Sequence, residues 1–285
     1  MKTNRRKEKL IKFMKRLARN KLAIVGMIII ILLLIAAVGA EWIAPYDPNY
    51  QDMTAIFQKP GGAHILGTDN LGRDMLSRLI YGTRLSLKMG VLSVALAALL
   101  GVTFGSIAGY YGGIVDDILM RFLDIYQSVP GLVFCVALAA ALGPGLENAI
   151  LAVGVTTMTG YARMIRASIM QIKNEEYIEA ATAINARDIR ILIKHILPNA
   201  ISPVVVQITM GIGGAILLSS TLSFIGLGVQ PPAAEWGCML AGGRSYMREY
   251  GYLVLEPGIA IMISVLSFNL LGDGLRDALD PRLRS

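Results

Sequence analysis

Three charged residues stand close together in the sequence GTDNLGRDMLSR and are the first candidates for site chemistry. Asp69, Arg73 and Asp74 would suit a catalytic or a metal-binding group, since carboxylates serve both purposes. The alternative, which we favour, is that they fix turns and form ion pairs in a loop leading into a membrane span. Residues 71–85, which follow, predict a helix lying at the outer membrane interface before the chain turns inward.

The remaining metal-ligating side chains are scattered. His64 and His195 are the only histidines, and the topology derived below places them on opposite sides of a membrane. Cys135 and Cys238 are too few for a disulfide framework or a zinc site, and Cys135 lies in an apolar run typical of a small buried side chain. We therefore predict no metal site and no cofactor bound by this chain.

Two sequence features argue against catalysis by this chain itself. The sequence LGDGLRD is similar to the Gly-x-Gly-Asp signature of intramembrane aspartyl proteases, but Leu270 occupies the first glycine position and no second aspartate lies within another predicted span. The phosphate-binding pattern G-x-x-x-x-G-K-[ST] occurs nowhere, so we predict that the chain does not hydrolyse ATP.

Glu256, near the outer end of the last predicted span, is a candidate for facing a transport pathway, because intramembrane ionisable residues are commonly functional.

The elements that must position these residues are membrane helices. The chain has 285 residues, of which 54% are hydrophobic and 16% charged, whereas soluble domains carry about 25% charged residues. The mean hydropathy is +0.57. Ten of the 27 Lys and Arg lie in residues 1–21, directly before an apolar run. The net charge of +7 therefore indicates a cytoplasmic anchor and not a nucleic-acid-binding surface.

Six stretches with few or no charges predict six membrane-spanning helices. The first covers residues 22–40, where a cleaved signal peptide is the alternative. A signal core has only about 7–15 apolar residues, and more spans follow, so we favour an uncleaved helix. The other five spans are predicted in residues 89–115, in the two parts of 125–162 that flank the sequence GPGLEN, in 196–234 and in 252–272. Within the second span, Gly101, Gly105 and Gly109 predict close helix packing.

The distribution of basic residues predicts the orientation. With the N-terminus inside, residues 1–21, the region of Arg121, the loop 163–198 and the tail together carry 20 of the 27 Lys and Arg. The outer segments carry the other seven, as the positive-inside rule requires. We therefore predict a multi-pass protein of the cell membrane with both termini in the cytoplasm, divided into 1–21 (cytoplasmic), 22–40 (first span), 41–84 (external loop), 85–273 (core with five spans) and 274–285 (cytoplasmic tail).

The cytoplasmic loop contains a block, NEEYIEAATAINARDIRILIKHILPN, that is too polar to cross a bilayer and too regular for a slack linker. Asn174 is a suitable N-cap for a first helix, and Asn185 would end that helix in left-handed backbone. The alanine-rich surface of this helix would let another protein approach closely. An amphipathic connector without a partner is the alternative. The second predicted helix carries Ile189, Leu192, Ile193 and Ile196 on one apolar face and closes at Leu197-Pro198.

This block resembles the EAA loop of ABC importer permeases. The sequence Glu179-Ala180-Ala181, a turn residue after a further three residues, and a hydrophobic stretch ending in Leu-Pro carry the resemblance. Asn185 stands where the family usually has glycine, and His195 where it commonly has isoleucine. In that family the loop forms a helix seated in a cleft of the cytoplasmic ATPase. The resemblance implies that the ATPase-coupling residues are Glu179, Ala180, Ala181, Asn185, Leu197 and Pro198.

Three further stretches resemble the dipeptide, oligopeptide and nickel branch of the same family. They are HILGTDNLGRDMLSRLIYGTRLSL at 64–87, GVQPPAAEWGCML at 228–240 and NLLGDGLRDALDPRLR at 269–284. Several separate motifs in the right order imply a permease subunit of the second type in that branch. The fold that the resemblance implies is all-α, with six transmembrane helices in the type I ABC importer (MetI-like) arrangement.

The resemblance also implies a function and partners. The chain would form half of the translocation pathway of an ATP-driven importer of dipeptides or oligopeptides. Its partners would be a second, related permease, two ATPase subunits that bind ATP and Mg²⁺, and an external substrate-binding protein, besides membrane lipid. Nickel import is the alternative within the family. An ATP-independent carrier is a more distant one, and no duplicated halves with broken helices support it. An integral membrane enzyme would need convergent His, Asp or Ser in the spans, which the sequence does not show.

Overall fold

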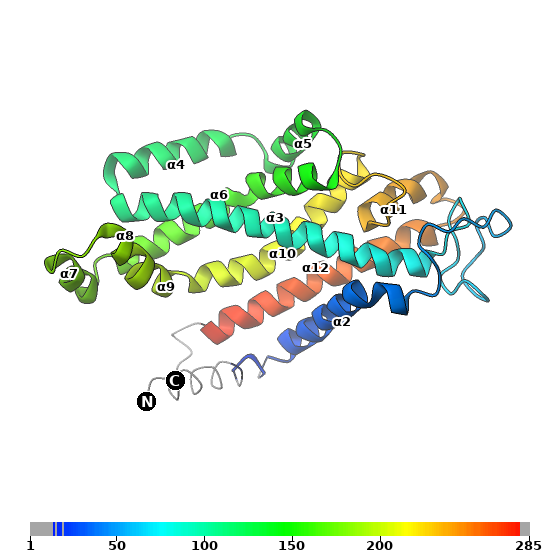
Figure 1. The fold of residues 1–285 in the computed structure, drawn as a ribbon, viewed down its shortest axis with the longest axis horizontal. Coiled ribbons are helices and arrows are strands. Elements are labelled where there is room, and N and C mark those ends of the chain that lie inside the picture. The colour runs from blue at the N-terminus through cyan, green and yellow to red at the C-terminus, as the bar shows by residue number, and fades with distance from the viewer. Residues whose placement is uncertain (1–13, 15, 19, 280–285) are drawn as a thin grey trace.

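A bundle of long helices makes up most of the computed structural model, which describes residues 14, 16–18 and 20–279 (Figure 1). Most of the predicted basic segment 1–21 and the end of the predicted tail, residues 280–285, lie outside these residues. The long helices are α2 (Lys21–Ile43), α3 (Met75–Tyr111), α6 (Leu146–Ile172), α10 (Ser202–Phe224) and α12 (Tyr252–Leu279). The shorter elements are α4 (Gly113–Gln127), α5 (Gly131–Leu142), α7 (Glu176–Ala183), α8 (Asp188–Ile191), a π-turn (Leu192–Ile196), α9 (Leu197–Ala200), α11 (Trp236–Gly243) and a 3₁₀ turn (Arg244–Tyr246).

Four helices of this part of the chain are long and apolar enough to cross a membrane, namely α2, α3, α10 and α12. The bent pair α4–α5 makes a fifth if the two are counted as one span. Helix α6, which was predicted as the fourth span, carries Arg163 and Arg166 and is not among them. Length and composition thus support four or five spans where the sequence predicts six.

The third span was predicted to begin at residue 125, so it covers α5 and only the last three residues of α4. Most of the rest of α4, including Arg121, was predicted as a cytoplasmic connection, whereas the structure has a helix there. Helices α4 and α5 meet at an angle of 86° across residues 128–130. Pro130 has no amide hydrogen and disfavours helical backbone at Val129, so the helix ends there and restarts beyond the proline. Arg166 on α6 donates to Asp116 on α4 from two nitrogens, Nη2 and Nε, and the Nε bond measures 2.5 Å. This ion pair holds α4 alongside the bundle although the chain turns away after it.

The close contact between α3 and α6 confirms the packing predicted for the glycine repeat. A Cβ atom added at Gly105 would collide with the Ala162 carbonyl oxygen, and one at Gly109 would lie 3.0 Å from the Arg166 carbonyl oxygen. Gly101 faces the backbone of α6 in the same way. The absence of side chains therefore lets the two backbones touch over two helical turns.

Helix α3 also corrects one prediction. Residues 75–85, predicted to lie at the outer interface, belong to the same 37-residue helix as the second span. Asp74 caps this helix by accepting a hydrogen bond of 2.8 Å from the Ser77 amide, so the chain enters α3 directly from the outer loop.

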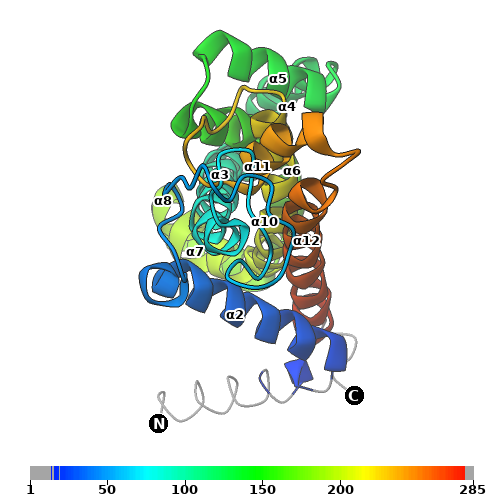
Figure 2. The ribbon, with the colours of Figure 1, turned by 90° about the vertical axis from the view of Figure 1, so that its right-hand side faces the viewer.

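The outermost helices flank the bundle on opposite sides, α2 on one and α4–α5 on the other (Figure 2). Helix α2 packs against α12, and Asn20 joins the two ends because its amide donates to Asp277 Oδ2 at 3.1 Å. The side-chain oxygen Oδ1 of Asn20 meanwhile accepts from the backbone amides of Leu22 and Ala23 and so caps α2. Both flanking helices expose large apolar side chains, as lipid-facing helices do: Leu22, Val25, Ile28, Ile31, Leu32 and Ile35 on α2, and Ile114, Ile118, Phe122 and Ile125 on α4.

Candidate functional site

Helices α7 to α9 project from the end of the bundle that lies opposite the external loop (Figure 1). The structure thus contains the two short helices predicted in residues 174–198, with a bend between α7 and α8. Helix α7 begins at Glu176, one residue later than predicted from Asn174 as the N-cap. Asn174 belongs to the turn that closes α6, where the Glu175 amide donates to the Ile172 carbonyl at 3.0 Å, and Glu175 is the N-cap.

The bend after α7 is built on Asn185, as the sequence predicts. Asn185 has a φ of +56°, in the left-handed region. Its amide donates to the Thr182 carbonyl at 2.9 Å, and the Ala186 amide donates to the Ala181 carbonyl at 3.2 Å. These two bonds form a Schellman motif, which is the usual way for a helix to end at a left-handed residue. The motif fixes the angle at which the chain leaves α7.

The predicted alanine surface of α7 is divided between two faces. Glu179 and Ala180 are exposed, but Ala181 is buried together with Ile178 in the main apolar core. Ile184, which follows the helix, is 80% exposed. The face available to another protein is therefore formed by Glu179, Ala180, Ala183 and Ile184, and Ala181 anchors α7 to its own chain.

The second helix does not have the single apolar face that was predicted. Leu192 and Ile196 are buried, whereas Ile189 and Ile193 are 61% and 57% exposed. The helix runs into the π-turn, in which the Leu197 amide donates to the Leu192 carbonyl, five residues back. One extra residue per turn shifts the positions that follow out of the register of an α-helix.

The same turn explains why Leu197-Pro198 does not close the helix. A proline inside an α-helix lacks one hydrogen bond and clashes with the carbonyl four residues earlier. The π-turn widens the chain before Pro198, which becomes one of the first residues of α9. The Asn199 side-chain amide donates to the His195 carbonyl at 2.7 Å. The chain then continues into α10 almost without interruption.

Two open grooves flank α7. The first has a volume of about 570 Å³ and the second about 720 Å³. Exposed concave surfaces on both sides of a short projecting helix suit insertion of that helix into a partner of complementary shape. The first groove is lined by Tyr110, Tyr111, Lys173, Ile178, Glu179, Thr182 and Ala183, and the second by Ala181, Ile184, Asn185, Ala186, Arg187, Ile189, Arg190, Lys194 and His195.

Contacts that sequence reasoning missed tie this segment to the bundle. The Tyr110 hydroxyl, at the end of α3, donates to Asp188 Oδ1 on α8 at 2.9 Å. Lys173, just after α6, donates from Nζ to the Tyr110 carbonyl at 2.5 Å and lies 5.6 Å from the centre of the Tyr110 ring. Tyr110 and Asp188 are 78 residues apart, so no local pattern links them. Together these contacts connect α3, α6 and α8 directly.

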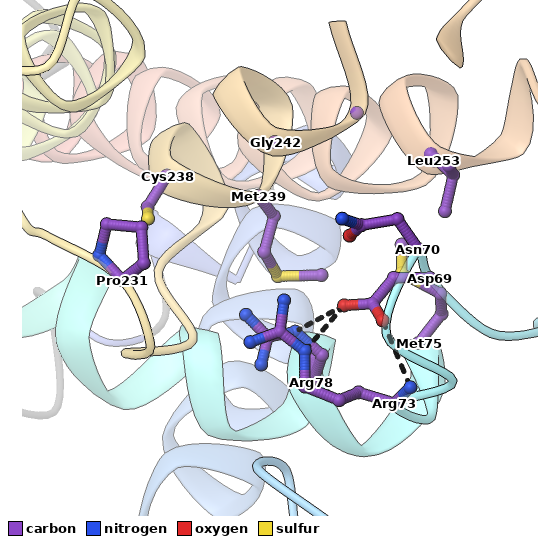
Figure 3. A pocket seen from close by; sticks show the side chains of 11 residues that line it. Asp69, Asn70, Arg73, Met75, Arg78, Pro231, Cys238, Met239, Gly242 and Leu253 are labelled. Carbon is purple, nitrogen blue, oxygen red and sulfur yellow. Dashed lines mark hydrogen bonds and ion pairs between the residues drawn. The ribbon is translucent and has the colours of Figure 1, made fainter. Parts of the chain in front are cut away.

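The charged cluster at the other end has the structural role that we favoured. Asp69 Oδ2 pairs with Arg73 Nε at 2.7 Å, and Asp74, besides capping α3, contacts His64 Nδ1 at 2.9 Å. Sequence reasoning missed a further member, Arg78, whose Nε lies 3.7 Å from Asp69 Oδ2 (Figure 3). Among the residues with described positions, no three His, Cys, Asp or Glu side chains are arranged to hold a metal.

Glu256 lies in α12 and lines an apolar groove of about 410 Å³ together with Leu33, Leu79, Trp236 and Ile263. Its Oε2 atom is buried and has no hydrogen-bond partner within the described chain. A role in a transport pathway stays a prediction for this residue.

Two protein families match the sequence. Residues 101–285 match the family described as "Binding-protein-dependent transport system inner membrane component". Residues 10–60 match the "N-terminal TM domain of oligopeptide transport permease C". The first match covers more than half of the chain and includes α6 to α12.

Curated relatives are similar over nearly the whole length. The dipeptide transport system permease protein DppC of Haemophilus influenzae is 43% identical over 272 residues, which are 93% of this chain and 92% of the relative. The glutathione transport system permease protein GsiD of Pectobacterium atrosepticum is 43% identical, with coverage of 96% and 91%. The di/tripeptide transport system permease protein DppC of Pseudomonas aeruginosa is 42% identical, with coverage of 96% and 92%.

The fold is similar to that of a solved transporter. A chain of the MetNI methionine ABC transporter in an inward-facing conformation superposes with a TM-score of 0.58, covering 72% of this chain and 98% of the other. The two sequences are 21% identical, so this likeness concerns the fold.

Proposed function

This chain belongs to the family of binding-protein-dependent transport system inner membrane components, and we propose that it forms half of the translocation pathway of an ATP-driven peptide importer. Within the family it is an ABC permease similar to the dipeptide and oligopeptide C-type permeases. The family is one of membrane components and not of ATPases. The specific substrate class, the coupling segment and the partner chains are parts of the proposal.

The proposed importer contains a second, related permease beside this chain, two cytoplasmic ATPase subunits and an external binding protein. Both termini lie in the cytoplasm, and α2, α3, the broken α4–α5 pair, α6, α10 and α12 form the six spans. The arginines that distinguish α6 lie toward its end, where Arg166 is neutralised by Asp116 and Arg163 by Asp124 at 2.7 Å. Such pairing lowers the cost of placing α6 partly within the membrane.

The observation that carries the coupling mechanism is the exposed face of α7 beside the Schellman turn at Asn185. A helix that is short, exposed and held at a fixed angle can follow a partner as a rigid body. When the ATPases close, α7 moves with them, and the Tyr110–Asp188 contact passes the displacement to α3. The work comes from the difference in contacts between the two ATPase states, because equal contacts would shift no equilibrium.

Relatives that carry dipeptides, di/tripeptides and glutathione support small peptides as the cargo. The test is uptake of a labelled dipeptide, labelled glutathione, a labelled longer peptide and nickel, in cells with and without the chain. Loss of dipeptide uptake supports the proposal, and the other peptides define the length range. Loss of nickel uptake alone would refute the peptide cargo, and uptake that continues without ATP would favour the carrier alternative.

A further inference from the structure

The external end of the molecule contains a small pocket with two arginines in its wall (Figure 3). The pocket lies between the external loop, the first turns of α3 and the helix α11, and its volume is about 60 Å³. This is several times the roughly 10–15 Å³ that one water needs, so a carboxylate group fits and a whole peptide does not. Its charged and polar wall is formed by Asp69, Asn70, Arg73 and Arg78, and its apolar wall includes Met75, Met239 and Leu253.

The pocket has more positive than negative charge. Arg73 and Arg78 share a single carboxylate oxygen, Asp69 Oδ2, at 2.7 and 3.7 Å. The side chains of Arg73, Arg78 and Asp69 are only 11%, 4% and 10% exposed. Burying a charge without a counter-charge is costly, because water no longer solvates it fully. The two guanidinium groups carry two positive charges and Asp69 carries one negative charge. One guanidinium charge is therefore left without a counter-ion.

The other carboxylates of this region are already engaged. Asp74 contacts His64 and accepts bonds from the amide and the hydroxyl of Ser77. Glu235, which is fully buried, accepts from the amides that begin α11 and from two serine hydroxyls. Within the described part of the chain neither lies within ion-pair distance of the two arginines.

Free donors face the space that remains. Arg78 is held in place by its Nη1 atom, which donates to the Pro48 carbonyl at 2.8 Å and reaches the Pro232 carbonyl at 3.5 Å. Its Nη2 atom, and both terminal nitrogens of Arg73, donate to no acceptor among the described residues, since Arg73 uses only Nε on its side chain. Guanidinium groups bind carboxylates with paired parallel hydrogen bonds, and here the donors are positioned before a ligand arrives.

We propose that this pocket binds the free carboxylate group of a small organic acid or peptide at the external mouth of the protein. The carboxylate supplies the missing counter-charge and accepts from Arg73 and Arg78, and the adjoining aliphatic carbon contacts Met239 or Leu253. The rest of the ligand remains outside the pocket. For a transported peptide, the pocket would contact the C-terminal carboxylate of the peptide. This part of the inference rests on the proposed function.

The test is direct binding to the purified full chain in detergent, without partner subunits, so that it does not depend on transport. The unfolding midpoint is measured at constant ionic strength against acetate and its neutral analogue acetamide, and against the dipeptide Ala-Ala and its C-terminal amide. A ligand that binds only the folded state stabilises it by RT ln(1 + [L]/Kd), so the midpoint rises with ligand concentration. We expect acetate and Ala-Ala to raise it, and acetamide and Ala-Ala amide to leave it unchanged.

Variants locate the effect. Arg73→Gln should weaken acetate binding at least tenfold, because it removes a guanidinium that holds no backbone carbonyl. Arg248→Gln, which removes an exposed arginine on the same side, should bind acetate normally. Equal responses to acetate and acetamide in the wild-type protein would overturn the proposal even if Arg73→Gln failed to fold. Equal acetate affinity in folded Arg73→Gln and wild type would overturn it as well. If acetate does not bind but the chain still supports dipeptide uptake, the carboxylate site is refuted and the proposed function stands.

Discussion

The Tyr110 hydroxyl donates a hydrogen bond of 2.9 Å to Asp188 Oδ1, and thereby joins the last turn of α3 to the first turn of α8. Helix α3 has 37 residues and reaches the external loop at its other end. Lys173 reinforces the joint by bonding the Tyr110 carbonyl. A displacement of the α7–α9 segment is therefore applied to the end of a long rigid helix.

Tyr110→Phe should lower peptide uptake per ATP hydrolysed by a factor of about 2–10, which corresponds to a loss of roughly 0.4–1.4 kcal/mol, the size of one net hydrogen bond. The measurement compares uptake with ATP hydrolysis in the reconstituted complex. Tyr111→Phe is the control, because this neighbouring tyrosine is more than half exposed. An unchanged ratio of uptake to hydrolysis in Tyr110→Phe would refute the transmission role of the contact.

Replacements of Asn185 should be ordered by their tolerance of left-handed backbone. Asn185→Gly should keep uptake at the wild-type level, whereas Asn185→Val should reduce it strongly, since a side chain in that conformation costs about 1–2 kcal/mol and a β-branched one is worse. Asn174→Val makes the same chemical change at an exposed asparagine without positive φ and should be tolerated. Normal uptake in Asn185→Val would show that the bend is not required.

Gly105→Ala should destabilise the folded protein by about 1–3 kcal/mol, because the new methyl group collides with the Ala162 carbonyl and α3 must move away from α6. The unfolding midpoint in detergent is the measurement. Gly160→Ala, in the middle of α6 with open space at its Cβ position, is the matched control. That variant should be neutral or slightly stabilising, because alanine favours helix over glycine by about 0.5–1 kcal/mol.

Ala180→Leu should prevent the ATPase subunits from copurifying with this chain, because Ala180 lies on the exposed face of α7 and a larger side chain would hold a partner away. The chain itself should stay folded, which the unfolding midpoint checks. Ala181→Leu should behave differently. Ala181 is buried, so its replacement should lower the midpoint first. Copurification of ATPases with Ala180→Leu at the wild-type yield would place the partner surface elsewhere.

The sequence predicted those features that depend on local chemistry or on strict spacing. The left-handed residue at Asn185 follows from the tolerance of asparagine for that backbone, and the α3–α6 contact follows from glycines four residues apart. Both are visible within a few residues of chain. The first span was predicted at 22–40 and is found at Lys21–Ile43 for the same reason.

The features that sequence reasoning missed depend on residues far apart in the chain or on competing backbone geometries. Arg78 joins Asp69 only because the external loop folds back on α3, and its guanidinium reaches Pro232, which is 154 residues away. The second short helix continues into a π-turn, which leaves the 3.6-residue pattern in the sequence unchanged. The bend between α4 and α5 had a local signal in Pro130, but the long apolar run concealed it.

The direction in which α7 faces depends on the number of residues between α8 and α10, and the π-turn over Leu192–Ile196 is part of that segment. Each residue of an α-helix corresponds to a rotation of about 100°, and this turn holds one residue more than an α-helical turn. Deleting a single residue within the turn would remove this extra residue and restore α-helical winding, so the flanking segments would keep roughly their facing. Deleting a residue from the α-helical segments on either side would instead rotate α7 and α8 relative to α10 by about 100°. Ile184 and Asn185 would then point to another side of the molecule. Outside the π-turn, the number of residues between Asp188 and Ser202 therefore determines the facing of the projecting helix, and insertions or deletions there should be far less tolerated than substitutions.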